Sequence, residues 1–280
     1  MPELRQRLIL VLVSLLTACS STPTPEVRQQ QAFDLARQSH WQPLTLDSQP
    51  FRLQAFVPER LQPNDVLTLY VEGDGLAWLT SSQPSADPTP VNPLALRLAL
   101  AQPDGNAVYL ARPCQFIASQ PSCQRRYWTD ARFAEEIVTA MNQAVEQLKE
   151  KAKARELVLV GYSGGAAVAL LLAARRQDIR QVISVAGNLD HAAWTTYHKI
   201  SPLYRSLNPA GRRQTLASVP QVHLVGAQDR IMPPDLARQF ISTYSSETPV
   251  RLLVMPDYDH ACCWARQWPR LWREELVPKP

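Results

Sequence analysis

A serine that could act as a nucleophile lies in the five-residue run Gly161-Tyr162-Ser163-Gly164-Gly165. A serine hydroxyl attacks poorly unless the backbone holds it clear of the chain, and the pattern G-x-S-x-G does this by forcing a sharp bend between a strand and a helix. Both flanks fit such a bend. Residues 157–160 are a short apolar run, typical of a buried parallel strand, and residues 166–174 are rich in alanine and leucine, which favour a helix. The alternative, a glycine turn with a chance serine, does not account for these flanks.

The backbone beside this serine is suited to hold negative charge. Gly164 would lie at the N-terminus of the following helix, where its N–H and the helix dipole stabilise an anion. The strand-like run 66–71 ends in Glu72-Gly73-Asp74-Gly75, and we expect the N–H of Asp74 or Gly75 to complete an oxyanion hole with Gly164. The two carboxylates of this loop would oppose an anion unless they point away. No complete phosphate-binding or dinucleotide-binding glycine motif is present.

A serine nucleophile needs a base, usually histidine, and a carboxylate that orients the histidine ring. His260 follows the last strand-like run, on a loop that the carboxyl end of a strand would bring to the same sheet edge as Ser163. His223 lies inside a strand-like run, where a packed or edge histidine is expected, and His40 precedes the core strands. We therefore expect His260 to be the base. The alternative is a loop histidine without a role.

Asp229 directly follows a strand-like run, within the segment GAQDRIMP, and is the carboxylate that we expect to orient His260. Asp190, after the preceding strand-like run, is the second choice. Asp257 and Asp259 lie so close to His260 in the sequence that they are more typical of turn formers. For each of these aspartates, the alternative is an exposed carboxylate that only contacts water.

Strand-like and helical segments alternate through the chain, which predicts an α/β fold with a mostly parallel central sheet and helices on both faces. The expected strands are 51–57, 66–71, 107–111, 157–161, 181–186, 221–226 and 250–255. The expected helices are 29–39, 94–101, 131–152, 165–176, 234–244 and 264–276. Ligands of such sheets bind at the carboxyl ends of the strands, where Ser163 would lie.

The chain resembles the bacterial α/β-hydrolases over about residues 50–275. The segment around Asp229 resembles the G-x-x-D-x-x-x-P acid loop of that family, and Glu72 stands where the family's oxyanion loop has histidine. The order of nucleophile, acid and histidine along the chain is also that of the family. The resemblance implies ester hydrolysis through an acyl-enzyme. Ser163 would attack, His260 would move the proton, Asp229 would hold the ring, and no metal or cofactor is implied.

The expected substrate is a small-molecule or lipid-like ester. Trp78 lies just past the oxyanion loop, Tyr162 precedes the serine, and Trp194 lies in the segment 187–219, where the family often places a cap. We expect these aromatic side chains to line an apolar acyl pocket. The alternative for aromatic residues in loops is packing on the domain.

The N-terminus predicts export and a lipid anchor. Arg5 and Arg7 precede the nine-residue apolar run Leu8 to Leu16, which is too short for a membrane span of roughly 20 residues and is typical of a cleaved signal. The segment Leu16-Thr17-Ala18-Cys19 resembles the bacterial lipoprotein signal box. This implies cleavage before Cys19, lipidation of that cysteine and, because Ser20 follows it, an outer-membrane location facing the periplasm. An ordinary secretory signal with an incidental cysteine is the alternative.

The expected organisation is therefore a signal peptide at 1–18, a tether at 19–28 and a single hydrolase domain at 29–280. Serine, threonine and proline dominate the tether, as in flexible linkers. The formal charge of +4, without a block of lysine and arginine, offers no electrostatic footprint for nucleic acid.

Four cysteines remain after the expected lipidation site: Cys114, Cys123, Cys262 and Cys263. An even number in an oxidising compartment favours disulfides, and three pairings are possible. We favour Cys114 with Cys123, which closes a short loop and leaves the other two free or joined as neighbours. The spacing lacks a C-x-x-C pair, so a zinc site is not expected.

A rival hypothesis from another class is a binding or structural lipoprotein that keeps this scaffold without turnover. The presence of serine, aspartate and histidine in the expected order argues against it. Peptidase, thioesterase and acyltransferase activities use the same chemistry and stay open.

Overall fold

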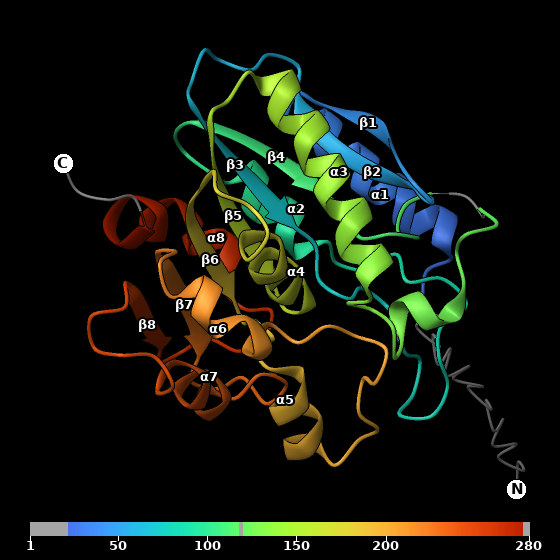
Figure 1. The fold of residues 1–280 in the computed structure, drawn as a ribbon. Helices are drawn as coiled ribbons and strands as arrows, with labels where there is room; N and C mark the ends of the chain where they lie inside the picture. The colour runs from blue at the N-terminus through green and yellow to red at the C-terminus, as the bar shows by residue number, and fades with distance from the viewer. Residues whose placement is uncertain (1–21, 118–119, 277–280) are drawn as a thin grey trace, which may run out of the picture.

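The computed structural model describes residues 22–117 and 120–276 and contains an eight-stranded sheet in the order β1-β2-β4-β3-β5-β6-β7-β8 (Figure 1). β2 pairs antiparallel with β1 and with β4, and the remaining pairs are parallel. The strands are β1 (Trp41–Ser48), β2 (Phe51–Pro58), β3 (Val66–Val71), β4 (Asn106–Leu110), β5 (Glu156–Tyr162), β6 (Ile179–Val185), β7 (Gln221–Gly226) and β8 (Val250–Met255). The expected α/β fold class is confirmed.

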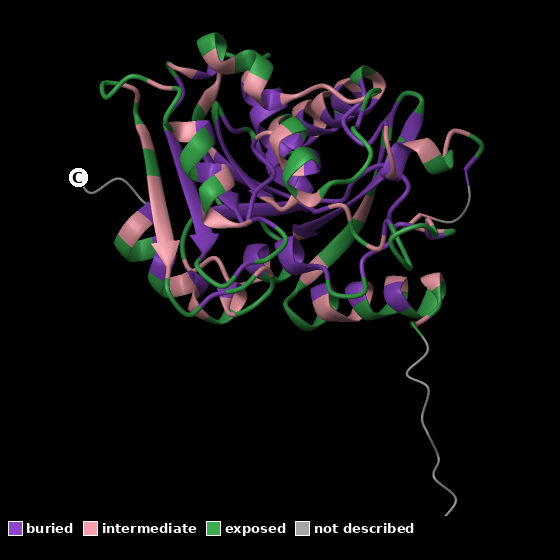
Figure 2. Ribbon diagram, turned by 90° about the horizontal axis from the view of Figure 1, so that it is seen from below, coloured by how far each residue is buried: buried purple, intermediate pink, exposed green. Residues whose placement is uncertain are grey.

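Helices cover both faces of the sheet, so alternate residues of the central strands enter two separate hydrophobic cores (Figure 2). Leu157 and Leu159 of β5 belong to the core with α3, α4 and α7, whereas Val158 and Val160 belong to the core with α1, α2 and α8. These helices are α1 (Pro25–Gln38), α2 (Leu94–Leu100), α3 (Glu135–Ala152), α4 (Gly164–Ala173), α7 (Pro234–Ile241) and α8 (Trp264–Leu271). A strand buried on both faces reads as a continuous apolar run, which explains why the central strands are evident in the sequence.

Shorter helical segments occupy the connections. They are η1 (Arg125–Trp128), α5 (His191–His198), η2 (Pro209–Arg212), α6 (Arg213–Leu216) and η3 (Trp272–Leu276). α5, η2 and α6 lie in the segment 187–219 that was expected to form a cap. The cap is therefore short and mostly irregular.

β1 is the one described strand that the sequence did not predict. Only two of its eight residues are buried, and Pro43 interrupts its pattern. β1 lies at the edge of the sheet, where a strand has a partner on one side only and proline is tolerated. Its weak apolar signal follows from that position.

α1 begins earlier than expected, at Pro25. The side chain of Thr24 accepts a hydrogen bond from the Val27 N–H, and proline at the first helical position favours this start. Residues 25–28 are therefore helical, and Arg28 is buried, which differs from the tether expected at 19–28. The expected signal peptide and Cys19 lie outside the described residues.

α3 begins at Glu135 rather than at residue 131, because the preceding Ala134 has an extended backbone. The residues just before it, including Arg132, form an irregular connection from η1. This connection delivers the Arg132 side chain to the candidate site described below.

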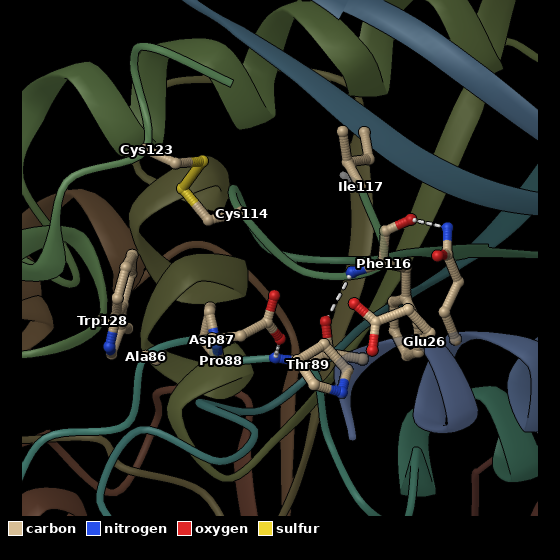
Figure 3. A pocket seen from close by; sticks show the side chains of 12 residues that line it. Glu26, Ala86, Asp87, Pro88, Thr89, Cys114, Phe116, Ile117, Cys123 and Trp128 are labelled. Atoms are coloured by element: carbon tan, nitrogen blue, oxygen red, sulfur yellow. Dashed lines mark hydrogen bonds between the residues drawn. A yellow bond between two sulfur atoms is a disulfide. The ribbon is translucent and has the colours of Figure 1, made fainter. Parts of the chain in front are cut away.

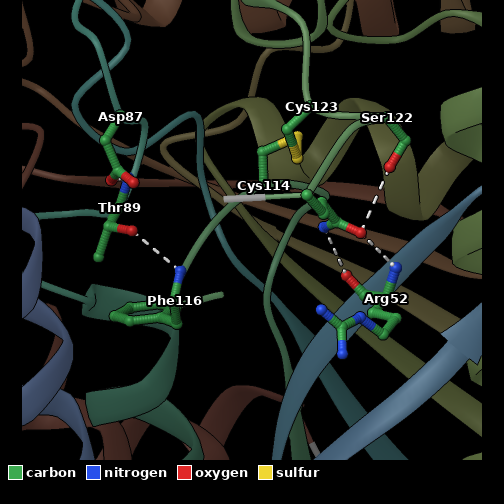
Figure 4. The surroundings of a disulfide bond; sticks show 8 residues. Arg52, Asp87, Thr89, Cys114, Phe116, Ser122 and Cys123 are labelled. Atoms are coloured by element: carbon green, nitrogen blue, oxygen red, sulfur yellow. Dashed lines mark hydrogen bonds between the residues drawn. A yellow bond between two sulfur atoms is a disulfide. The ribbon is translucent and has the colours of Figure 1, made fainter. Parts of the chain in front are cut away.

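The structure joins Cys114 to Cys123, the pairing that the sequence favoured (Figure 4). It also joins Cys262 to its neighbour Cys263. Inside the loop closed by the first pair, Gln120 is bound to the backbone of Arg52 in β2. The Arg52 N–H donates to Gln120 Oε1 at 2.9 Å, and Gln120 Nε2 donates to the Arg52 carbonyl at 3.2 Å. Gln120 thus bonds this loop to β2 near one end, and the other end, Cys114, lies in the segment that follows β4.

Replacing both Cys114 and Cys123 by serine should lower the free energy of unfolding by about 2–3 kcal/mol, because the cross-link restricts the unfolded chain. Urea denaturation of the oxidised wild type and the variant measures the difference. As a control, iodoacetamide should modify neither cysteine in unfolded, unreduced wild type. Superimposable denaturation curves would contradict the prediction.

Candidate active site

The backbone at Ser163 has the conformation expected of a nucleophile turn. Ser163 lies between β5 and α4 with φ 50° and ψ −121°, a positive-φ conformation that non-glycine residues adopt only where the surroundings impose it. Its N–H donates to the Val185 carbonyl at 3.0 Å. A Cβ at Gly165 would lie 2.4 Å from the Val71 carbonyl oxygen, so this position has no room for a side chain. The turn therefore depends on glycine to bring α4 close to the ends of the strands.

Ser163, His260 and Asp229 form a hydrogen-bonded chain in the expected order. Ser163 Oγ is 3.1 Å from His260 Nε2, and His260 Nδ1 is 2.8 Å from Asp229 Oδ2. They come from the ends of β5, β8 and β7, which are neighbours or near neighbours at the carboxyl edge of the sheet. With a proton on Nδ1, the ring donates to the carboxylate and presents a free nitrogen to the serine hydroxyl. The arrangement can therefore withdraw a proton from Ser163.

Asp229 is held in place by three donors. Its side chain is buried, and Oδ1 accepts from the N–H groups of Ile231 and Met232, both at 2.8 Å, while Oδ2 faces His260. Burial by itself raises the pKa of Asp229, but the hydrogen bonds and the charge of His260 outweigh it, so the pKa is lowered overall. Asp229 therefore remains ionised and can orient the imidazole.

The second-choice acid, Asp190, has a different place. It caps the N-terminus of α5, where its Oδ1 accepts from the N–H groups of Ala192 at 3.1 Å and Ala193 at 3.2 Å. His223 is not accessible to a substrate, because it is fully buried in β7. Its Nδ1 lies 2.7 Å from Ser184 Oγ. Burial lowers the pKa of His223 to about 3, which keeps it neutral as a packed residue.

The loop expected to donate to an oxyanion lies directly beside the serine. β3 pairs with β5 so that Val71 is opposite Gly161, and residues 72–75, called the oxyanion loop below, follow β3 at the same edge. The N–H groups of Asp74 and Gly75 have no hydrogen-bond partner among the described residues. Gly164 begins α4, and the first N–H groups of a helix have no partner within it.

The two carboxylates of the oxyanion loop have different partners. Glu72 turns toward the N-terminus of α2, where Oε1 accepts from the N–H groups of Gly73 at 2.9 Å and Ala95 at 3.4 Å, and the Tyr109 hydroxyl donates to Oε2 at 3.1 Å. Glu72 is 1% exposed, and this burial raises its pKa to about 7 despite the hydrogen bonds that favour ionisation. A carboxyl group that points away and is partly protonated at neutral pH does not oppose a nearby anion.

Asp74 does not point away but is neutralised by two arginines that the sequence analysis missed. Arg132 Nη1 lies 2.6 Å from Asp74 Oδ2, and Arg112 Nη1 lies 3.2 Å from Oδ1. Burial raises the pKa of Asp74, but the charges of Arg132 and Arg112 outweigh it and lower the pKa overall. A Cβ at Gly164 would lie 2.1 Å from Asp74 Oδ1, so the carboxylate packs directly against the serine turn. The one available signal was the position of Arg112, just after a strand that ends at this edge.

A cavity of about 550 Å³ opens beside Ser163 and His260. All three predicted pocket residues line it: Trp78, Tyr162 and Trp194. Trp194 is fixed by a 2.9 Å hydrogen bond from its indole N–H to the Ile231 carbonyl, and the Tyr162 ring lies 5.3 Å from the His260 ring. Trp78 is 39% exposed and lies at the mouth of the cavity. The space is largely apolar, with its charged groups near the serine.

Replacing Glu72 by glutamine should change the pH dependence of stability. The pKa of Glu72 is raised in the folded state to about 7. The protonated carboxyl group therefore contributes its full stabilisation below about pH 4.5, and this contribution is lost as the pH rises to 7. A glutamine amide can still accept from the loop and donate to Tyr109, without a charge to bury. The free energy of unfolding of E72Q relative to wild type should therefore rise by roughly 2–3 kcal/mol between pH 5 and pH 8.

Urea denaturation of both proteins at the two pH values measures this difference. Parallel pH profiles for wild type and E72Q would show that the buried carboxyl group titrates normally.

Comparison with known proteins gives one family and a group of related structures. A family model described as "Serine hydrolase (FSH1)" matches residues 95–260, a range that includes Ser163, Asp229 and His260. No curated protein matches the chain.

Among solved structures, the chain is similar to an α/β serine hydrolase homologue from Coxiella burnetii, with 17% identity over 84% of this chain and 95% of that chain and a TM-score of 0.56. It is also similar to an α/β serine hydrolase without lid from Xanthomonas campestris, with 18% identity over 86% and 97% and a TM-score of 0.56. An esterase from Pyrococcus furiosus is similar with 12% identity over 84% of this chain and 88% of that chain and a TM-score of 0.59. These similarities identify the α/β-hydrolase fold. Because the family model covers more than half of its 280 residues, the chain belongs to the FSH1 serine hydrolase family.

Proposed function

We propose that this protein hydrolyses carboxylic esters through an acyl-enzyme formed on Ser163. The observation that carries the proposal is the hydrogen-bonded chain from Ser163 Oγ to His260 at 3.1 Å and from His260 to Asp229 at 2.8 Å. His260 takes the proton as Ser163 attacks the ester carbonyl, and returns it to the leaving alcohol as the acyl-enzyme forms. Water, activated by the same ring, then releases the acid and restores the serine.

The oxyanion of each tetrahedral intermediate would form beside the N–H groups of Gly164 and of Asp74 or Gly75. Donors that are fixed before the reaction stabilise developing charge at no cost in reorganisation, and loss of one donor typically costs about 10²–10³ in kcat. The ion pairs of Asp74 with Arg112 and Arg132 support this role, because they offset a carboxylate that would otherwise repel the oxyanion. Asp74 thus contributes through its backbone, while the charge of its side chain is offset by Arg112 and Arg132.

The lining of the cavity supports an apolar acyl group as the part of the substrate that it binds. Trp78, Tyr162, Trp194, Val91 and Met232 surround a space of about 550 Å³ next to the serine. Burial of an apolar group contributes about 0.8 kcal/mol for each CH₂. We accordingly expect esters of short to medium acyl chains to be better substrates than acetates.

Anchoring in the outer membrane through a lipid on Cys19 is a separate proposal, supported by the signal-like sequence alone. Within the described ranges, none of the helices has the length and apolar content needed to cross a bilayer. Covalent lipid chains would supply the membrane affinity.

A fluorophosphonate probe should label wild-type protein stoichiometrically at Ser163, because an activated serine attacks phosphorus as it attacks a carbonyl. The S163A variant should be unlabelled and should not hydrolyse p-nitrophenyl butyrate above the rate in buffer. Peptide mass mapping of the adduct identifies the residue. A folded wild-type protein without label and without turnover on a panel of acyl esters would favour the binding or structural alternative.

Replacing each of the two candidate acids by asparagine should give clearly different losses in kcat. D229N should lower kcat by about 10³–10⁴, since the amide no longer holds the ring in the productive tautomer. D190N, which alters the cap of α5 and the contacts of Asp190 with Asn208 and Arg213 but none with His260, should keep kcat within about threefold. Steady-state kinetics on p-nitrophenyl butyrate compare the two, with circular dichroism to verify folding. Equal losses in both variants would contradict the assignment of Asp229.

A further inference from the structure

Residues outside the oxyanion loop pack against it and hold it in place. A Cβ at Gly75 would lie 2.0 Å from the Pro88 carbonyl oxygen and 2.8 Å from Gln115 Nε2, so the loop is packed between these two groups. The Pro88 carbonyl accepts from the Leu76 N–H at 3.1 Å, just beyond the loop. Gly75 has φ 64°, which also excludes most side chains. The position of the loop therefore depends on its neighbours.

Gln115 forms a hydrogen bond to the backbone of the oxyanion loop. It is 1% exposed, and its Nε2 donates to the Gly73 carbonyl at 3.0 Å. Its Oε1 accepts from the Arg112 N–H at 3.0 Å, and its own N–H donates to the Arg112 carbonyl at 3.2 Å. Arg112 in turn reaches Asp74 at 3.2 Å. One short turn thus binds two successive residues of the oxyanion loop.

The turn itself, residues 112–116, is fixed from the opposite side. Cys114 is joined to Cys123, the Phe116 N–H donates to Thr89 Oγ1 at 2.9 Å, and Gln29 Nε2 of α1 donates to the Phe116 carbonyl at 2.6 Å (Figure 3). Cys114 and Phe116 have φ values of 73° and 58°, conformations that residues with a Cβ adopt where surrounding contacts impose them. A second cavity, of about 310 Å³, lies between α1 and the disulfide behind this turn, away from Ser163.

We propose that the turn 112–116 sets the position of the oxyanion loop and that Gln115 is a positioning residue for the reaction. Gln115 acts through the backbone of Gly73: its amide holds the carbonyl on one side of the loop, so the N–H groups of Asp74 and Gly75 face the serine. This inference rests on the proposed function. Small displacements of donors that must meet a developing charge reduce the rate strongly, while substrate binding in a separate apolar cavity is little affected.

Gln120 offers a matched control for Gln115. Both glutamines lie within the span closed by Cys114 and Cys123, both are buried, and each side chain makes one donated and one accepted bond to backbone. Gln120 is bonded to Arg52 in β2, whereas Gln115 is bonded to Gly73 and Arg112. The same substitution at the two positions therefore removes similar bonds but only one link to the oxyanion loop.

The test compares Q115M with Q120M in the full chain, using p-nitrophenyl butyrate. Q115M should lower kcat by about 10- to 100-fold with KM within about threefold of wild type, because donors to the transition state are displaced and the acyl cavity is not. Q120M should keep kcat within about threefold. Their melting temperatures should fall by similar amounts. If Q115M does not fold, Q115N and Q120N repeat the comparison, since asparagine keeps the amide uncharged but is one CH₂ too short to make the same bonds.

Equal kcat values for the Gln115 and Gln120 variants, or a rise in KM as the main effect at Gln115, would overturn the inference. Failure of the proposed function would look different, because wild type itself would then show neither turnover nor labelling of Ser163.

Discussion

The site depends on one close approach, between the turn at Ser163 and the carboxyl end of β3. The N-terminus of α4 can meet this edge only because Gly165 leaves its space to the Val71 carbonyl, 2.4 Å from where a Cβ would lie. This contact places the serine hydroxyl, the first N–H of α4 and the oxyanion loop in one small volume. Within the same turn, Ser163 has a positive φ of 50°, an unfavourable conformation for a residue with a side chain that the surrounding packing must sustain.

Three carboxyl groups lie close to the serine, and the fold controls the charge of each by a different physical means. Glu72 is buried without a cation, so its pKa rises to about 7. Asp74 is buried with Arg112 and Arg132, so it stays ionised within an ion-paired cluster. Asp229 is buried with hydrogen-bond donors, and faces His260. Of the three, Asp229 is the one bonded to the imidazole that reaches Ser163 Oγ.

The central strands were predictable because burial on both faces makes each of them a continuous apolar run, as in β5 and β7. β1 escaped prediction because an edge strand with two buried residues carries little apolar signal. Ser163, His260 and Asp229 could be proposed from the sequence, since each lies on a turn or loop at the carboxyl end of a strand-like run. Arg112, Arg132 and Gln115 could not be assigned roles, because no sequence motif marks them and their bonds to Asp74 and Gly73 join segments 38 to 58 residues apart.

The sequence by itself determined the central strands and the helices between them, the turn at Ser163 and the short list of groups that could accompany it. These are local properties, since they follow from apolar periodicity and from the steric needs of glycine over a few residues. Only the tertiary structure decided between Asp229 and Asp190 as the neighbour of His260, and showed that Asp74 is neutralised rather than turned away. Such outcomes depend on which segments the sheet brings together, and the energy of a charge depends on partners that no local pattern specifies.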